Sequence, residues 1–285
     1  MATEVSLVLT ATFWGLNFAA TKYAAATISP LMLVALRFTV GGLLLLLVLR
    51  ILEPKSRLRR GDILPMAALG CLGVATAQTG FTFGVSLSSA GSTGLIFATA
   101  PVWGLLLGAI LGLERPTWKG VLGVGLSIVG VALVVLDGLT SGNARLVGDL
   151  LVLLAAFCVG TYAVLSMPLL ERYTPLAVAT YPILFGIPFL LLLSSPLFLS
   201  LDWGSVGAGP WAAVAYAGVF ATAFAFAAWQ RGISRIGANR VLVYQYLITI
   251  VAVTSGIVFF GETLGINKIA GGVVILVGVY LARRQ

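Results

Sequence analysis

Charged side chains are scarce in this sequence, and histidine is missing from it. Only 9% of the 285 residues are charged, while 60% are hydrophobic. An average soluble domain carries about 25% charged residues. No compact water-soluble core can hide that much apolar surface, so the composition excludes an ordinary soluble domain. The two cysteines, Cys71 and Cys158, both lie inside apolar runs, which argues against a disulfide framework.

The lack of histidine also removes several kinds of catalytic chemistry. A zinc enzyme of the HExxH type needs histidine ligands, and a serine hydrolase needs a base beside its serine. The nine carboxylates all fall at the ends of apolar runs or between them, so an aspartyl protease would lack its buried pair. The sequence therefore predicts a protein that is not an enzyme and that holds no metal or cofactor.

Apolar runs of about 20 residues, in contrast, are abundant, and that is the length a helix needs to cross about 30 Å of hydrocarbon. Breaks at charged residues, proline and glycine separate ten runs, at 5–24, 30–51, 62–85, 89–112, 117–136, 147–167, 176–199, 208–231, 237–259 and 264–282. Glu4 precedes the first run and no basic residue does, which is unlike a signal peptide. We expect an all-α integral membrane protein with ten transmembrane helices, the first of them retained.

Lysine and arginine are distributed unevenly between the two sides of this layout. One side holds Lys22, Arg145 and Lys268, and Arg37 lies within a run. The remaining thirteen lie on the other side, and by the positive-inside rule that side, with both termini, faces the cytoplasm. This bias accounts for the net charge of +8, so the only partners expected are membrane lipid and a small-molecule substrate, with no nucleic acid; a monomer is compatible with the sequence.

The two halves of the chain resemble each other. The segment Ala90–Val131 aligns without gaps on Ala238–Val279, at an offset of 148 that superposes Glu114 on Glu262, Gly123 on Gly271 and Gly130 on Gly278. Ser29–Leu31 likewise echoes Thr174–Leu176. Since each half holds five runs, an odd number, the second half must enter the membrane inverted. We expect two inverted five-helix repeats, 1–140 and 141–285, around a central cavity near the membrane midplane.

Three motifs resemble the drug/metabolite transporter superfamily, in particular its ten-helix exporters built from two EamA-type repeats. They are WGLNF at 14–18, ALRF at 35–38, and the ATAP, GLLLG and LGLERPT pattern between Ala98 and Gly120. The resemblance is strongest to aromatic amino-acid exporters. It implies export of amino acids and related metabolites or drugs across a bacterial-type inner membrane. One departure is that Pro101 has Thr249 opposite it in the second half.

Polar and aromatic side chains predict the lining of the cavity. Thr10, Trp14, Asn17 and Thr21 share one face of the first run, and a polar stripe is not expected to face lipid. The resemblance implies a cavity lined by the first, third, fourth, sixth, eighth and ninth helices. The substrate-binding candidates on them are Trp14, Asn17, Gln78, Thr82, Thr99, Trp103, Thr161, Tyr162, Trp229, Tyr244 and Gln245. Hydrogen bonding between helices is the alternative explanation for each polar residue.

Four further residues have candidate structural or electrostatic roles. Arg37 lies ~10 Å inside the second run, where it either snorkels or packs, or attracts an anionic group such as a substrate carboxylate. Glu114 and Glu262 are expected to bind backbone donors or a loop arginine at helix ends. Pro101 predicts a kink, with the fourth and ninth helices bending as gates.

The position of the carboxylates bears on the mechanism. A proton-coupled transporter usually keeps an ionisable group within the membrane, and none of the nine lies near the middle of a run. We therefore expect uniport by alternating access. A passive channel lined by the same polar stripe, a proton antiporter, and a lipid-handling or scaffold protein are the alternatives.

Overall fold

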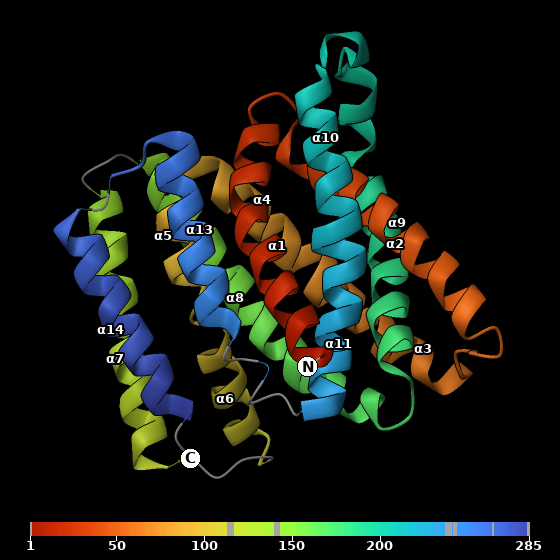
Figure 1. The fold of residues 1–285 in the computed structure, drawn as a ribbon, viewed down its shortest axis with the longest axis horizontal. Coiled ribbons are helices and arrows are strands. Elements are labelled where there is room, and N and C mark those ends of the chain that lie inside the picture. The colour runs from red at the N-terminus through yellow and green to blue at the C-terminus, as the bar shows by residue number, and fades with distance from the viewer. Residues whose placement is uncertain are drawn as a thin grey trace.

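The computed structural model describes residues 2–112, 117–139, 143–236, 241, 244–263 and 265–283, and all regular secondary structure in these ranges is helical (Figure 1). Seven helical segments within them are long and apolar enough to cross a membrane, and two shorter apolar helices follow at Tyr244–Phe260 and Ile266–Leu281. The all-α, membrane-type fold expected from the sequence is thus confirmed.

The first half of the chain comprises α1 (Ala2–Ala25), α2 (Pro30–Leu52), α3 (Ile63–Gly70), η2 (Cys71–Thr76), α4 (Ala77–Leu87), α5 (Ala90–Phe97), α6 (Ala100–Ile110) and α7 (Trp118–Leu139). The second half comprises α8 (Asn143–Leu170), α9 (Pro175–Ser200), α10 (Ala208–Tyr216), η4 (Ala217–Phe224), α11 (Ala225–Ile236), α13 (Tyr244–Phe260) and α14 (Ile266–Arg283). The predicted runs overlap these helices, singly or in consecutive groups. Most of 237–243, the start of the ninth run, lies outside the described residues.

The repeated Ser/Thr-Pro-Leu motif is a helix start in both halves. The Ser29 hydroxyl accepts a hydrogen bond from the Met32 amide, and Pro30 follows as the first residue of α2. The Thr174 hydroxyl accepts one from the Ala177 amide at the start of α9. Side-chain caps and a proline at the first helical position both satisfy a helix start, because proline lacks a donor that would otherwise be orphaned.

Three of the predicted runs are not uniform α-helices. The third run contains a π-helical segment, η2, between α3 and α4, and the eighth contains the π-helical segment η4 between α10 and α11. The fourth is interrupted at Ala98 and Thr99, between α5 and α6. Pro101 stands in the first turn of α6, where its missing amide removes no hydrogen bond. Instead of a kink at Pro101, the structure has a two-residue break just before it, at Ala98 and Thr99.

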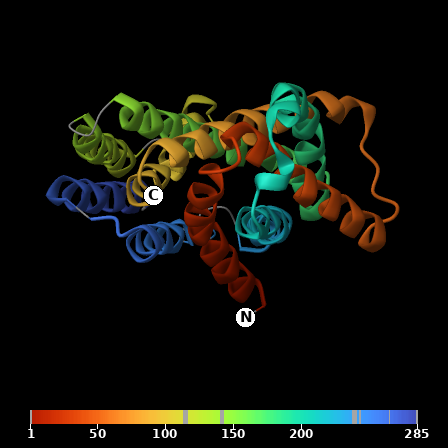
Figure 2. The ribbon, with the colours of Figure 1, turned by 90° about the horizontal axis from the view of Figure 1, so that it is seen from above.

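Glycines allow the helices to approach one another closely. In Figures 1 and 2, α7 and α14 lie side by side at one edge of the molecule. A Cβ placed on Gly130 of α7 would lie 2.7 Å from the Gly271 carbonyl oxygen of α14, and one on Gly278 would lie 2.6 Å from that of Gly123. Side chains at these points would force the helices apart, because backbone packed against backbone cannot yield locally.

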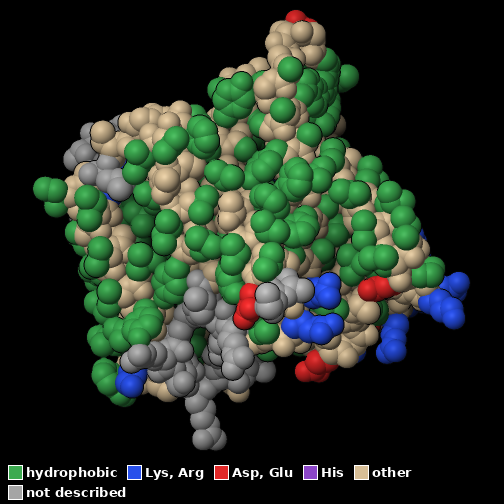
Figure 3. Space-filling model, viewed as in Figure 1, with side chains coloured by type: hydrophobic (Ala, Val, Ile, Leu, Met, Phe, Trp, Pro, Cys, Tyr) green, Lys and Arg blue, Asp and Glu red, His purple; other side chains and the backbone are tan. Residues whose placement is uncertain are grey.

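The surface is apolar over most of its height. Figure 3 shows hydrophobic side chains covering the middle of one face, while most of the visible Lys, Arg, Asp and Glu side chains lie near its lower end and one acidic side chain lies at its upper tip. Large apolar residues such as Leu192 and Leu199, which are 73% and 91% exposed, point outward from α9. Such exposure would promote aggregation in water, whereas hydrocarbon solvates it.

Candidate functional site

A cavity of about 200 Å³ lies inside the helix assembly. Its walls come from α1, α2, α4, α6, α8, α11 and α13, with η2, η4 and the end of α5, so both halves of the chain contribute. The predicted residues on these walls are Trp14, Asn17, Arg37, Gln78, Pro101, Tyr162, Trp229 and Gln245. Residues distant in sequence are thus brought around one space.

Aromatic rings form one wall of this cavity. The Trp14 ring packs 4.9 Å from the Trp229 ring and 5.7 Å from that of Phe226, centroid to centroid. The Trp14 indole nitrogen donates a 2.7 Å hydrogen bond to the Ala221 carbonyl in η4. This bond holds the indole in place. Its acceptor lies in a π-helical segment, and such segments are often found at functional sites.

Three phenylalanines stand beside the cavity as a second aromatic group. Phe18, Phe81 and Phe97 pack edge to face, with centroid distances of 4.8 Å, 5.5 Å and 6.1 Å between their pairs, and all three contribute to the lining. The candidate residues predicted from the sequence did not include them. A single phenylalanine within an apolar run resembles ordinary core, although Phe18 directly follows Asn17 and Phe81 lies one turn beyond Gln78.

Arg37 is buried against this lining, with 3% of its surface exposed. Its guanidinium lies 4.9 Å from the ring centroid of Phe38 and 5.7 Å from that of Phe81, and it hydrogen-bonds the side-chain oxygen of Gln78. Within the part of the chain that the structure describes, no carboxylate pairs with it. The charge is thus held inside the protein by ring faces and one neutral acceptor.

Five predicted residues lie outside the cavity lining. The Thr99 hydroxyl donates to the Ile96 carbonyl and accepts from the Trp103 indole, so both residues brace the break between α5 and α6. Thr82 and Thr161 are buried, and Tyr244 packs on the cluster around Phe18. Periodicity places residues on a helix face, but it does not fix how that face is rotated relative to its neighbours.

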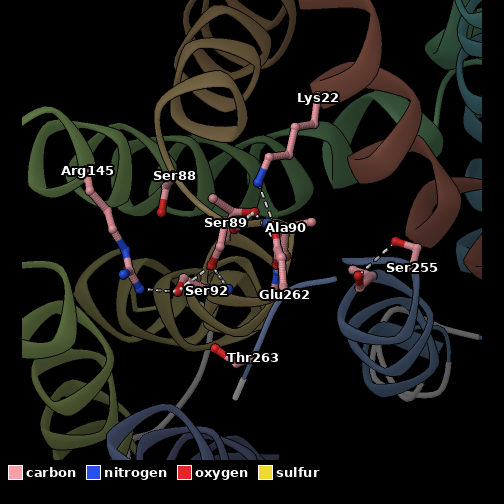
Figure 4. A network of polar contacts seen from close by, with 12 residues as sticks. Lys22, Ser88, Ser89, Ala90, Ser92, Arg145, Ser255, Glu262 and Thr263 are labelled. Carbon is pink, nitrogen blue, oxygen red and sulfur yellow. Dashed lines mark hydrogen bonds and ion pairs between the residues drawn. The ribbon is translucent and has the colours of Figure 1, made fainter. Parts of the chain in front are cut away.

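A polar network occupies one end of the molecule, centred on Glu262 (Figure 4). The Glu262 carboxylate accepts hydrogen bonds from the amides of Ala90 (2.8 Å) and Gly91 (2.9 Å), and the Lys22 amine lies 2.6 Å from it. Burial acts to raise the pKa of Glu262, but these donors outweigh it, so the pKa lies below its ordinary value. Glu262 therefore caps α5 as a carboxylate and ties it to the end of α1.

The same network contains every basic residue expected on the lysine- and arginine-poor side. Arg145 donates to the Ser92 hydroxyl at 3.1 Å, and Lys268 approaches that of Ser89 at 3.5 Å. Asp149, which is fully buried in α8, accepts a hydrogen bond from Ser88 nearby. Glu114, the residue aligned with Glu262, lies outside the described residues.

Helices of this length and composition around an internal cavity indicate a multi-pass membrane protein. The model of the EamA-like transporter family matches residues 1–136 and again 146–284. The chain therefore belongs to the EamA-like transporter family, and the resemblance seen in its motifs is confirmed. The family and its named relatives are transporters rather than enzymes. Among the described residues, no group of histidine, cysteine, aspartate or glutamate could hold a metal ion.

Relatives of known name extend over nearly the whole chain. A probable terminal-alkyne amino-acid exporter of Streptantibioticus cattleyicolor is 32% identical, over 98% of this chain and 93% of its own length. An uncharacterized transporter of Archaeoglobus fulgidus is 27% identical, over 99% and 98%. A probable amino-acid metabolite efflux pump of Salmonella typhimurium is 26% identical, over 94% and 90%. A protein of known crystal structure shares the fold, with a TM-score of 0.69 and 19% sequence identity. The match covers 99% of this chain and 96% of the chain in that structure.

Proposed function

We propose that this transporter exports small organic solutes, chiefly amino acids including aromatic ones and related metabolites or drugs, as a uniporter working by alternating access. The cavity carries the proposal. Its walls are indole and phenyl rings with buried amides, and its described lining contains no carboxylate. Such walls suit a zwitterionic or apolar molecule, whereas a purely cationic drug would find no described carboxylate to pair with, only ring faces and neutral amide oxygens. The names of two relatives as amino-acid exporters or efflux pumps support the same class of substrate.

We assign substrate binding to the predicted residues that line the cavity, namely Trp14, Asn17, Gln78, Tyr162, Trp229 and Gln245. The other candidates, Thr82, Thr99, Trp103, Thr161 and Tyr244, support the surrounding helices. Glu262 acts structurally at the network end, and the same role is proposed for Glu114.

We further propose ten transmembrane helices in two inverted repeats, 1–140 and 141–285. Matching contacts support this arrangement. A Cβ placed on Gly15 would lie 2.9 Å from the Ile248 carbonyl oxygen, and one on Gly160 would lie 2.3 Å from that of Ala100. Gly15 corresponds to Gly160 at the offset that relates Ser29–Leu31 to Thr174–Leu176. Ala100 corresponds to Ile248 at the offset of 148. A two-fold axis relating the halves would generate each contact from the other, which supports the proposed arrangement.

The π-helical segments support the same two-fold relation. At an offset of 148, η2 (Cys71–Thr76) falls on 219–224, which lies inside η4 (Ala217–Phe224). When the two halves are exchanged, the contact between α1 and α13 corresponds to that between α8 and α6. The contact between α2 and η4 corresponds in the same way to that between α9 and η2. We infer that the transport site lies where the repeats meet.

The charge distribution supports an orientation in a bacterial-type inner membrane with both termini in the cytoplasm. Lys22 and Arg145 lie in the network of Figure 4, and the Lys268 amine approaches the Ser89 hydroxyl of the same network. In Figure 1 the start of α1 and the end of α14 lie near the opposite, lower end, where Figure 3 shows other charged side chains. The network therefore faces outward in this orientation.

Alternating access requires the two ends of the cavity to open in turn. At the outward end, the three phenylalanines and the Glu262 network tie α1, α4 and α5 together, so we interpret this conformation as closed outward. The break at Ala98 and Thr99 lets α6 tilt without moving α5. The fourth helix is thus proposed to bend as one gate, with the ninth as its partner.

Counterflow in proteoliposomes tests the proposal. Vesicles loaded with unlabelled amino acid should take up labelled amino acid transiently above equilibrium, and the initial rate should saturate. A panel of amino acids with a cationic dye would rank the substrates. Flux that rises linearly with concentration and shows no counterflow would indicate a passive pore, and no flux of any solute would exclude both functions.

A further inference from the structure

Four polar side chains that line the cavity are almost completely buried, and each carries an atom without a hydrogen-bond partner. The exposed fractions are 4% for Asn17, 3% for Arg37, 2% for Gln230 and 5% for Gln245. The atoms are Asn17 Oδ1, Arg37 Nε, Gln230 Oε1 and Gln245 Nε2. Buried polar atoms are nearly always paired, since leaving one unpaired costs the free energy of its desolvation. Because all four side chains line one cavity, the missing hydrogen-bond partners point to a bound ligand that supplies them.

Arg37 defines the anionic end of that ligand. A guanidinium has only donors and keeps its charge, while its partners here are the neutral oxygen of Gln78 and the faces of two phenyl rings. Ring faces and one amide do not neutralise a buried charge. A carboxylate would supply both the counter-charge and an acceptor for Nε.

The amide oxygens of Asn17 and Gln230 lack donors in the same cavity. Both are acceptors, and an ammonium group offers three donors and no acceptor. Each amide is close in sequence to an indole of the cavity wall, since Asn17 lies one turn after Trp14 and Gln230 directly follows Trp229. A neutral acceptor beside a ring face binds an ammonium group without adding a negative charge to the site.

Resting on the transport function proposed above, we propose that the site recognises both charged groups of a free α-amino acid. Arg37 binds the carboxylate, Asn17 and Gln230 accept from the ammonium group, and the wall of Trp14, Phe226 and Trp229 contacts the side chain. Gln245 offers one more donor. The substrate must therefore carry both charges. A solute without a carboxylate leaves Arg37 unpaired, and a solute without an ammonium group leaves the amide oxygens of Asn17 and Gln230 unpaired.

Three solutes with the same ring separate these requirements: phenylalanine, phenethylamine, which lacks the carboxylate, and 3-phenylpropionate, which lacks the amine. Counterflow into wild-type proteoliposomes should be at least tenfold faster for phenylalanine than for either analogue. Arg37→Gln should slow phenylalanine at least tenfold while changing phenethylamine much less. Arg37→Lys, which keeps a positive charge at this position, should recover part of the preference for phenylalanine over phenethylamine. Asn17→Leu with Gln230→Leu should raise the KM for phenylalanine relative to 3-phenylpropionate.

Thr79→Val is the matched control, because the Thr79 hydroxyl is also buried without a partner but lies outside the cavity lining. It should leave the ranking of the three solutes unchanged. If all three solutes exchange equally in the wild type, the two-charge requirement is wrong while the transport function stands. If none of them and no amino acid exchanges, the transport function itself fails. The wild-type ranking decides the question even where a variant does not fold.

Discussion

At the scale of single residues, Glu262 joins three segments through one carboxylate. It caps the start of α5 with two amide hydrogen bonds and pairs with Lys22 at the end of α1. A negative charge at a helix start is favourable because the helix dipole is positive there. The ammonium group of Lys22 also lies 5.2 Å from the ring centroid of Phe260, so removing the carboxylate would leave that amine with a ring face as its remaining described contact.

Glu262→Gln should lower the stability of the protein by about 1–2 kcal/mol at neutral pH, because the charged hydrogen bonds to Lys22 and α5 become neutral ones. The effect should depend on pH. The pKa of Glu262 in the folded protein lies below its ordinary value of 4.5, so the folded state binds the proton less tightly than the unfolded state. The stabilisation is therefore complete above pH 4.5 and is lost as the pH falls through the lowered pKa.

Thermal unfolding in detergent, followed by tryptophan fluorescence between pH 3 and 7, measures this effect. The wild type should lose stability on acidification more steeply than Glu262→Gln. Glu171→Gln serves as the control, because Glu171 is exposed beyond the end of α8. Equal acid sensitivity in the wild type and in Glu262→Gln would show that this carboxylate does not hold the network.

At the scale of helices, glycine positions determine which surfaces meet. Gly130 and Gly125 lie on the same helix, α7, yet their surroundings differ. A Cβ on Gly130 would lie 2.7 Å from backbone atoms of α14, whereas one on Gly125 has nothing within 4 Å. One helix thus offers a test site and its own control.

Gly130→Val should destabilise the protein by about 1–3 kcal/mol, since extra atoms at a backbone contact force the helices apart. Gly125→Val should change stability by a few tenths of a kcal/mol, within the range of exposed substitutions. Thermal midpoints of the two purified variants give the comparison. Similar midpoints would mean that α7 and α14 do not pack through these glycines.

Relative motion of the fourth and eighth helices can be tested by restraining them. Leu105 on α6 and Ile233 on α11 both line the cavity. In a background with Cys71 and Cys158 replaced by alanine, a thiol-specific cross-linker joining Leu105→Cys to Ile233→Cys should abolish at least nine-tenths of counterflow. The two single-cysteine variants treated alike should remain active. Undiminished transport by the cross-linked protein would contradict the gating proposal.

The positions of the helices could be predicted from the sequence, because the length of an apolar run is set by the membrane and charges and prolines mark its ends. The interruptions could not. Nothing in the residues of η2 or η4 distinguishes a π-helical segment from its neighbours, and Pro101 predicted a kink without giving the break at Ala98 and Thr99.

The candidate site was predicted in part for a related reason. Trp14 and Asn17 were placed correctly on the cavity side because several polar residues share their face. Thr82 and Thr99 do not line the cavity. The Thr99 hydroxyl donates to the Ile96 carbonyl one turn earlier, whereas the Thr82 hydroxyl is buried without a hydrogen-bond partner, so a polar residue type alone does not show which face of a helix meets the cavity. Phe18, Phe81 and Phe97 become recognisable only when three separate helices are brought together.

At the scale of the whole molecule, the proposal of an uncoupled carrier rather than a proton antiporter rests on the cavity lining, whose described residues include no carboxylate. Asp149, which is buried, and Glu262, which is partly buried, both lie in the network of Figure 4 and are hydrogen-bonded there. A proton carrier would have to load and release its proton within the substrate pathway.

Internal pH recorded during downhill amino-acid flux tests this claim most directly. Proteoliposomes containing a trapped pH-sensitive dye receive labelled phenylalanine, and uptake and internal pH are followed together. Uniport predicts that phenylalanine equilibrates without exceeding its external concentration and that the internal pH stays constant. A pH change that accompanies uptake and disappears in Glu262→Gln or Asp149→Asn would show proton coupling and contradict the proposed mechanism.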